Sequence, residues 1–223
     1  MVQERADLRL AAVHRLMVAL GESVSDQALL GAYEASGVEA HRWWKDEHRG
    51  YTTAERIRWM LRQLGLERPD DCEHVAEVCR AVDAALLDFP PPLLAGAAET
   101  IRELASRFPL AIVSDTGFAS GVAQDALLER DGLLAYFPVR IYSMDIGHAK
   151  PRPEPFHAAV EALGIARHEA LHIGDIERTD VRGALGAGLR AVRCDVIPRR
   201  RGSSAAELVI REYGELVEYL LGE

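Results

Sequence analysis

Cysteine and long apolar segments are both scarce in this sequence. Its 223 residues include only three cysteines, Cys72, Cys79 and Cys194. An odd number without a Cys-x-x-Cys pair favours a reducing compartment over a disulfide framework. No apolar run approaches the ~20 residues that span a bilayer, and the first seven residues lack the apolar centre of a signal peptide. The sequence therefore predicts a cytoplasmic protein with no membrane partner.

Basic residues are also in deficit. There are 26 Lys and Arg against 35 Asp and Glu, which gives a formal net charge of −9. This balance disfavours nucleic acid as a partner, because a phosphate backbone repels an acidic surface. Arg199, Arg200 and Arg201 form one local basic cluster, which we interpret as a solvated loop before the last helix. The oligomeric state is left open.

Strand-like alternation is missing from the first 90 residues, which show helical periodicity only. Thr52-x-x-Glu55 is a capping box that opens one helix, and Asp70 or Asp71 is expected to cap the next. The expected helices cover residues 7–21, 25–44, 52–65 and 70–88. We therefore predict an all-helical domain over residues 1–90.

The pattern changes at Pro90-Pro91-Pro92, because three prolines end a helix. Short apolar runs then alternate with helical stretches, as in strands covered by helices on both faces. Strands are expected at 110–114, 139–142, 170–173 and 190–194, and helices at 97–107, 118–130, 154–163, 178–187 and 204–221. This predicts an α/β core over residues 91–223 with a doubly wound parallel sheet.

Two carboxylates follow the strand expected at 170–173. Gly174-Asp175 ends the strand and Asp180 lies where a helix begins, and ligands of open α/β sheets bind at the carboxyl ends of strands. Because Mg²⁺ prefers oxygen ligands, we interpret Asp175 and Asp180 as a magnesium pair. The alternative is that Asp180 only caps its helix and Asp175 is a turn residue. His172, in mid-strand, is expected to be a packed core residue.

Two further candidates follow other expected strands. Ser114 ends the strand at 110–114, where its hydroxyl and the next backbone amides suit a phosphate oxygen; the alternative is a plain helix N-cap. Lys150 precedes Pro151 and Pro153, which fix its backbone and make it a point charge suited to a phosphate. Taken alone, a lysine beside proline is usually a surface residue.

Three tryptophans, Trp43, Trp44 and Trp59, lie in the helical part and are expected to pack within it. A substrate-facing patch is the alternative, because polar residues accompany them. These are Arg42, Lys45, Arg49 and Tyr51.

These motifs, in this order, resemble the haloacid dehalogenase-like superfamily over essentially the whole chain. The resemblance implies a helical cap over residues 1–90 and the rest of the α/β core after it. It implies that Ser114 binds the phosphoryl group, Lys150 steadies nucleophile and phosphate, and Asp175 ligates Mg²⁺ with support from Asp180. The acidic pair points to the phosphatase branch and a small phosphorylated substrate. Asp115 departs mildly from the family, in which asparagine is frequent there.

The larger departure is the nucleophile. The family places Asp-x-Asp-x-Thr or Asp-x-x-Gly-Thr at the end of its first strand, and nothing in this chain matches that motif. We expect either that the chain begins at an internal methionine of a longer enzyme or that it is a non-catalytic relative that binds a phosphate-bearing ligand or a protein partner. As written, the chain is predicted to have little or no phosphatase activity. The missing strand should expose two strand edges, with 110–114 pairing directly with 170–173 or an association covering them.

Overall fold

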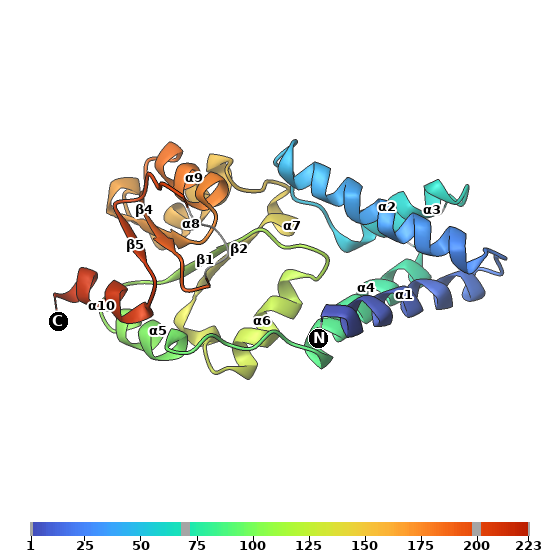
Figure 1. Cartoon of the computed structure of the whole chain (residues 1–223), viewed down its shortest axis with the longest axis horizontal. Helices are drawn as coiled ribbons and strands as arrows, with labels where there is room; N and C mark the ends of the chain where they lie inside the picture. The colour runs from blue at the N-terminus through green and yellow to red at the C-terminus, as the bar shows by residue number, and fades with distance from the viewer. Residues whose placement is uncertain (1, 68–71, 198–201, 223) are drawn as a thin grey trace. The chain divides into compact units, whose positions relative to one another are not determined.

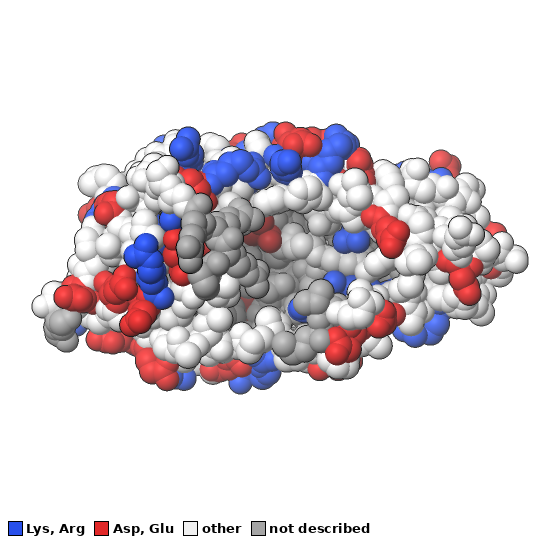
Figure 2. Space-filling model, viewed as in Figure 1, with Lys and Arg blue, Asp and Glu red and all other residues white. Residues whose placement is uncertain are grey.

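The structure of this protein is a computed structural model that describes residues 2–67, 72–197 and 202–222. Within these ranges no helix has both the length and the apolarity needed to cross a bilayer. The three cysteines are free thiols. Acidic and basic side chains intermingle over the face shown in Figure 2. The expected basic cluster at 199–201 lies outside the described residues.

The chain divides into two compact units. One consists of Met1–Pro92 together with Thr116–Leu127, and the other of Leu93–Asp115 together with Leu128–Glu223. We call them the helical unit and the α/β unit. The segment that follows Ser114 and Asp115 therefore belongs to the helical unit, although it interrupts the α/β unit in sequence.

Four helices form most of the helical unit. They are α1 (Val2–Ala19), α2 (Asp26–Lys45), α3 (Thr53–Gln63) and α4 (Glu73–Asp88). Helix α1 packs along α4, and α2 along α3 (Figure 1). Their apolar faces meet in one core, in which Val13, Met60 and Val82 are fully buried. The predicted helical character of this region is confirmed.

Local signals define the ends of these helices. Thr52 accepts a hydrogen bond from Glu55 N at 3.1 Å, and Thr52 N donates to Glu55 Oε2 at 2.7 Å, which completes the expected capping box. Asp70 and Asp71, the expected caps of α4, lie outside the described residues. Helix α4 begins at Glu73, with Cys72 at the N-cap position.

The α/β unit alternates strands and helices. In chain order its elements are α5 (Ala97–Ala105), β1 (Ala111–Ser114), η1 (Leu134–Tyr136), β2 (Val139–Tyr142), α7 (Ser143–Ile146), α8 (Pro153–Leu163), η2 (Arg167–Glu169), β3 (Leu171–Gly174), η3 (Glu177–Val181), α9 (Arg182–Gly186), β4 (Arg190–Cys194), β5 (Leu208–Ile210) and α10 (Tyr213–Leu221). Helix α6 (Gly121–Arg130) begins in the helical unit. Element η3 is a π-helix, which continues into α9. Phe156, Val181 and Ala184 are buried in one core cluster of this unit.

All strand pairs are parallel, as predicted, but they form two sheets. Strand β1 pairs with β2, and β3 pairs with β4, which pairs with β5 (Figure 1). Among the described residues, β1 and β3 each pair with one strand and are edge strands. The expected direct pairing of 110–114 with 170–173 is therefore wrong, and the alternative, an association that covers these edges, stays a prediction. The expected helix at 204–221 is wrong in its first part, where Leu208–Ile210 forms β5 against β4.

Candidate functional site

The loop after β3 is shaped by the contact between Gly174 and Asp180. A Cβ atom at Gly174 would lie 2.5 Å from both Cβ and Cγ of Asp180, so only glycine allows this approach. Asp180 Oδ2 accepts a hydrogen bond from Ile176 N at 2.8 Å, which closes the loop over the strand end. Asp180 is buried, whereas Asp175 is exposed at the start of the loop.

Lys150 joins this loop to β1. Its Nζ lies 2.7 Å from Asp180 Oδ1 and donates to the carbonyl oxygen of Val113 at 3.0 Å. Both charged side chains are buried, with 10% and 5% of their surfaces exposed. Lys150 and Asp180, from separate sequence motifs, thus form one buried ion pair between the carboxyl ends of β1 and β3.

Ser114 and Asp175 end β1 and β3. The Ser114 hydroxyl makes no hydrogen bond with any described residue, and neither does the Asp175 carboxylate. Ser114 is not a helix cap: α6 begins at Gly121, and Ser120 Oγ accepts the capping bond from Ala123 N at 3.2 Å. The alternative interpretation of Ser114 as an N-cap is therefore wrong, and its hydroxyl remains available to a ligand.

The contacts of Asp180 keep its buried carboxyl group ionised. Burial alone would raise the pKa of Asp180, but the contacts with His172 and Lys150 outweigh it and hold this pKa well below its usual range. Burial lowers the pKa of His172, which favours the neutral imidazole. His172 Nε2 lies 3.6 Å from Asp180 Oδ1, too far for a hydrogen bond. Its ring packs edge-on against Phe156 with centroids 5.0 Å apart, as expected for a core residue.

Asp115, the departure from the family pattern, faces the Lys150 backbone. Its Oδ1 accepts a hydrogen bond from Lys150 N at 2.9 Å. One oxygen of this carboxylate is thus committed to the backbone of the loop that carries Lys150.

Of the two predicted magnesium ligands, Asp175 is better suited to bind the ion than Asp180. Among the described residues no group of three or more His, Cys, Asp or Glu is arranged to hold a metal. Mg²⁺ nevertheless binds through one or two carboxylates when waters and a substrate phosphate complete its shell. Asp175 has a free carboxylate, whereas both oxygens of Asp180 are occupied by Lys150 and Ile176 N. The residues fit one direct ligand, Asp175, with Asp180 acting through Lys150.

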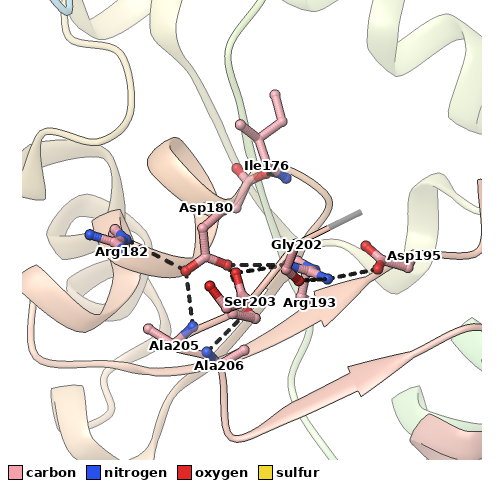
Figure 3. Close-up of polar contacts among 11 residues, drawn as sticks. Ile176, Asp180, Arg182, Arg193, Asp195, Gly202, Ser203, Ala205 and Ala206 are labelled. Carbon is pink, nitrogen blue, oxygen red and sulfur yellow. Dashed lines mark hydrogen bonds and ion pairs between the residues drawn. The ribbon is translucent and has the colours of Figure 1, made fainter. Parts of the chain in front are cut away.

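A second network, missed in the sequence, anchors this loop to β4. Arg193, with 8% of its side chain exposed, donates to Asp195 Oδ2 at 2.8 Å and to the carbonyl oxygen of Gly202 at 3.1 Å (Figure 3). Glu177 comes two residues after Asp175. Its Oε2 lies 3.6 Å from Arg193 Nη1, and its Oε1 accepts a hydrogen bond from Ala205 N at 2.9 Å. The available signal was an arginine inside an apolar strand, which needs acidic partners when buried.

The tryptophans pack within the helical unit. Trp43 is buried edge-on against Tyr51, with ring centroids 5.3 Å apart. Among the polar neighbours, Arg42 pairs with Glu39 at 2.6 Å, and Arg49 pairs with Glu55 at 2.8 Å while it stacks on Trp43. These arginines already have carboxylate partners, so the geometry favours packing over a substrate-facing patch.

Comparison with known proteins identifies the class. Residues 7–188 match the haloacid dehalogenase-like hydrolase family. The chain belongs to this family of hydrolases, and the resemblance seen in its motifs is confirmed.

Among curated relatives, a phosphoserine phosphatase from Thermus thermophilus is 32% identical over 177 residues, which cover 79% of this chain and 66% of that protein. The matched segments cover 42–66% of the lengths of the first three curated relatives, all of them phosphatases or nucleotidases. This chain therefore matches only part of each relative.

Solved structures confirm the fold. A 2-haloacid dehalogenase from Pseudomonas syringae superposes with a TM-score of 0.68 at 20% identity, covering 98% of this chain and 91% of that one. A HAD-hydrolase, YfnB, from Bacillus subtilis superposes with a TM-score of 0.58 at 22% identity, covering 98% and 92%. That second protein was crystallised bound to magnesium.

Proposed function

We propose that this chain carries the phosphate-handling residues of a Mg²⁺-dependent phosphatase that acts on a small phosphorylated metabolite in the cytoplasm. The observation that carries the proposal is the buried Lys150–Asp180 pair, which lies between Ser114 and Asp175 at the ends of two parallel strands. A buried ammonium beside a free hydroxyl suits a phosphate dianion, and a free carboxylate suits the Mg²⁺ that would accompany it.

Each residue has a role in this proposal. The Ser114 hydroxyl binds a phosphoryl oxygen, and Lys150 offsets the charge of the phosphate. Asp180 positions Lys150 by their ion pair. Asp175 would hold Mg²⁺, which supplies charge neutralisation at the phosphoryl oxygens.

The nucleophile is the remaining requirement. Asp180 is committed to Lys150, and Asp115 to Lys150 N, so neither is free to attack phosphorus. We propose that the nucleophile lies on a strand ending in Asp-x-x-Gly-Thr that fits between β1 and β3. Both are edge strands among the described residues, and the Lys150 contacts span the space between them.

The test compares two forms of the protein. Residues 1–223 are assayed with 4-nitrophenyl phosphate and Mg²⁺, and so is the same chain with an N-terminal extension that carries the strand and its motif. We expect turnover only from the extended form, and none when the first motif aspartate is changed to asparagine. Turnover by residues 1–223 that Asp175→Ala abolishes would show a nucleophile inside this chain. Phosphate binding without turnover in either form would favour the non-catalytic alternative.

A further inference from the structure

Arg193 is a buried charged residue near the carboxyl end of β4. It is the register partner of Gly174, the residue directly before Asp175, and only 8% of its side chain is exposed. The two residues before it, Ala191 and Val192, are buried and apolar. A buried guanidinium is costly in free energy unless it is paired, so its partners decide where this side chain lies.

The Arg193 guanidinium joins three segments of the α/β unit. Its Nη2 atom donates to Asp195 Oδ2 at 2.8 Å and to the carbonyl oxygen of Gly202 at 3.1 Å (Figure 3). Its Nη1 atom lies 3.6 Å from Glu177 Oε2 in the loop after β3. Arg193 thus connects that loop to the end of β4 and to the start of the segment 202–206.

Glu177 connects the same loop to this segment a second time. Its Oε2 accepts a hydrogen bond from Ser204 Oγ at 2.6 Å, and its Oε1 accepts one from Ala205 N at 2.9 Å. These two bonds and the contact with Arg193 engage both carboxylate oxygens of Glu177. The side chain of Glu177 therefore fixes the backbone of the loop two residues after Asp175.

Asp175 is held in place by its neighbours in the chain. Before it, Gly174 lies in the sheet opposite Arg193. After it, Ile176 N donates to Asp180 Oδ2 at 2.8 Å. The Asp175 carboxylate itself makes no hydrogen bond with any described residue, so the contacts of the residues around it determine its position.

Arg190, at the other end of β4, offers a matched comparison. Its register partner is Leu171, at the start of β3. Its Nη2 atom lies 2.9 Å from Glu207 Oε1 and donates to Tyr219 Oη at 2.9 Å. Arg190 thus makes the same kinds of contact as Arg193, but at the end of the strands opposite to Asp175.

Fold stability alone is a weak reason for a buried Arg193. Apolar residues of similar volume in place of a buried ion pair are often neutral or stabilising, and Arg193 Nε is buried without a hydrogen bond. The network is better explained by the order that it gives to the loop carrying Asp175. In metal sites, residues that hold a ligand in place change the metal affinity by about 10–100-fold when they are mutated.

We propose that Arg193 and Glu177 are positioning residues that hold the loop 175–180 closed, so that the Asp175 carboxylate is fixed where it would bind Mg²⁺. The inference rests on the proposed phosphatase function, in which Asp175 is the metal ligand. Without either residue the loop loses contacts with the segment 202–206, and metal binding would then have to order the loop at a cost in free energy. The affinity for Mg²⁺ should fall, although no ligand of the metal has been removed.

The first experiment measures the order of the loop without metal. Amide hydrogen exchange of residues 1–223 is followed by NMR in EDTA. The Ile176 amide, which is hydrogen-bonded inside the loop, reports whether the loop is closed. We expect Ile176 to exchange about tenfold faster or more in Glu177→Ala and in Arg193→Met, as for a lost hydrogen bond to a charged group.

Comparison with the amides of β4 separates positioning from a loss of fold stability. A variant that only destabilised the whole unit would speed exchange at Ile176 and in β4 alike, whereas a positioning role affects Ile176 alone. Arg190→Gln should leave the exchange of Ile176 within about twofold. Unchanged exchange at Ile176 in Glu177→Ala and Arg193→Met would overturn the proposal, and so would equal acceleration in β4. If Arg193→Met does not fold, Arg193→Lys takes its place, since lysine keeps the charge without the planar paired donors.

The second experiment measures Mg²⁺ binding directly. Residues 1–223 and the extended form are titrated with magnesium chloride, and the amide signal of Asp175 is followed by NMR. In Glu177→Ala and in Arg193→Met the Kd for Mg²⁺ should rise about 10–100-fold. The double variant should bind no more weakly than the weaker single variant, because both residues hold one loop. Arg190→Gln should keep the Kd of the wild type.

The outcomes of the titration separate this proposal from the proposed function. Mg²⁺ binding that Asp175→Asn abolishes, but that Glu177→Ala and Arg193→Met leave unchanged, would overturn the positioning role and keep Asp175 as the metal ligand. A wild type that binds no Mg²⁺ in either form would reject both the metal role of Asp175 and the effect on metal affinity proposed for Arg193 and Glu177.

Discussion

At the scale of single residues, the Lys150–Asp180 pair makes the site depend on both partners. A buried charge that loses its partner costs far more than an exposed one, because water cannot replace the contact. Lys150 and Asp180 could each be predicted from the sequence as site residues, but their contact could not. Residue types at strand ends are visible in a sequence, whereas a 2.7 Å approach across 30 residues depends on the fold.

Lys150→Met should destabilise the protein by about 3–5 kcal/mol, because Asp180 is left as an unpaired buried charge. Urea unfolding measures the loss. Arg80→Gln is the control, since the Arg80–Glu73 pair is exposed and such pairs contribute about 1 kcal/mol or less. The double change Lys150→Met with Asp180→Asn should recover part of the stability. If Lys150→Met destabilised the protein no more than Arg80→Gln, the buried ion pair would be contradicted.

Gly174→Ala should destabilise by about 1–3 kcal/mol, the usual range for an overpacked site. The added Cβ meets Asp180 at 2.5 Å. Gly31→Ala is the matched control, because nothing lies within 4 Å of its Cβ position inside α2, and there alanine should stabilise by about 0.5–1 kcal/mol. If Gly174→Ala proved as stable as the wild type by urea unfolding, the close approach would be wrong.

His172 should make stability fall with acidity below about pH 6.5. Burial lowers its pKa in the folded state from 6.5, although Asp180 acts in the opposite direction. The unfolded chain therefore takes up the proton first, and the free energy of unfolding decreases as pH falls, by about 1.4 kcal/mol for each unit of pKa difference. His172→Phe should flatten this slope between pH 5 and 6.5 in the presence of EDTA, whereas the exposed His74→Gln should not. A slope unchanged by His172→Phe would contradict the lowered pKa.

At the scale of elements, the sequence indicated where a helix begins but not which strands pair. The capping box at Thr52 and Glu55 uses four consecutive residues, so the start of α3 could be predicted. Strand β5 is three apolar residues, Leu208–Ile210, beside a helical stretch, and only its pairing with β4 makes it a strand. The π-helix η3 (Glu177–Val181) had no local sequence signal either.

Thr52→Ala should cost about 1 kcal/mol of stability, the typical effect of losing an N-cap side chain. The Thr52 hydroxyl satisfies Glu55 N, which otherwise lacks an intrahelical partner. Circular dichroism during urea unfolding measures the change. Ser23→Ala, at an exposed position between α1 and α2, should stay within about 0.5 kcal/mol. A Thr52→Ala effect as small as that of Ser23→Ala would mean that the box does not stabilise α3.

At the scale of the whole molecule, the division of the strands into two sheets is the main feature. The sequence allowed the parallel α/β class to be predicted, because each strand is a short apolar run between helices. It did not indicate how the edges of β1 and β3 would be satisfied, which depends on a lysine from a different loop. The Arg193 network was missed likewise, because its partners Glu177 and Gly202 are distant in sequence.

Exposed strand edges favour association with other chains. Residues 1–223 should therefore self-associate more than the extended form that carries the completing strand, and the extended form should melt at a higher temperature. Sedimentation velocity at several protein concentrations measures the first effect. Identical sedimentation and melting of the two forms would show that the strand does not enter between β1 and β3.

Lys150 Nζ occupies the backbone carbonyl oxygen of Val113 in the edge strand β1. A strand that pairs with β1 on this side competes for that carbonyl, since parallel ladders use the backbone acceptors of both strands. Lys150 Nζ has three donors, and Val113 and Asp180 engage two of them. If the proposed strand pairs with β1 here, it would free one of these donors and would bring its aspartate to the same end of the sheet. In the proposed extended form, pairing of the added strand with β1 and release of a Lys150 donor toward the phosphate would occur together.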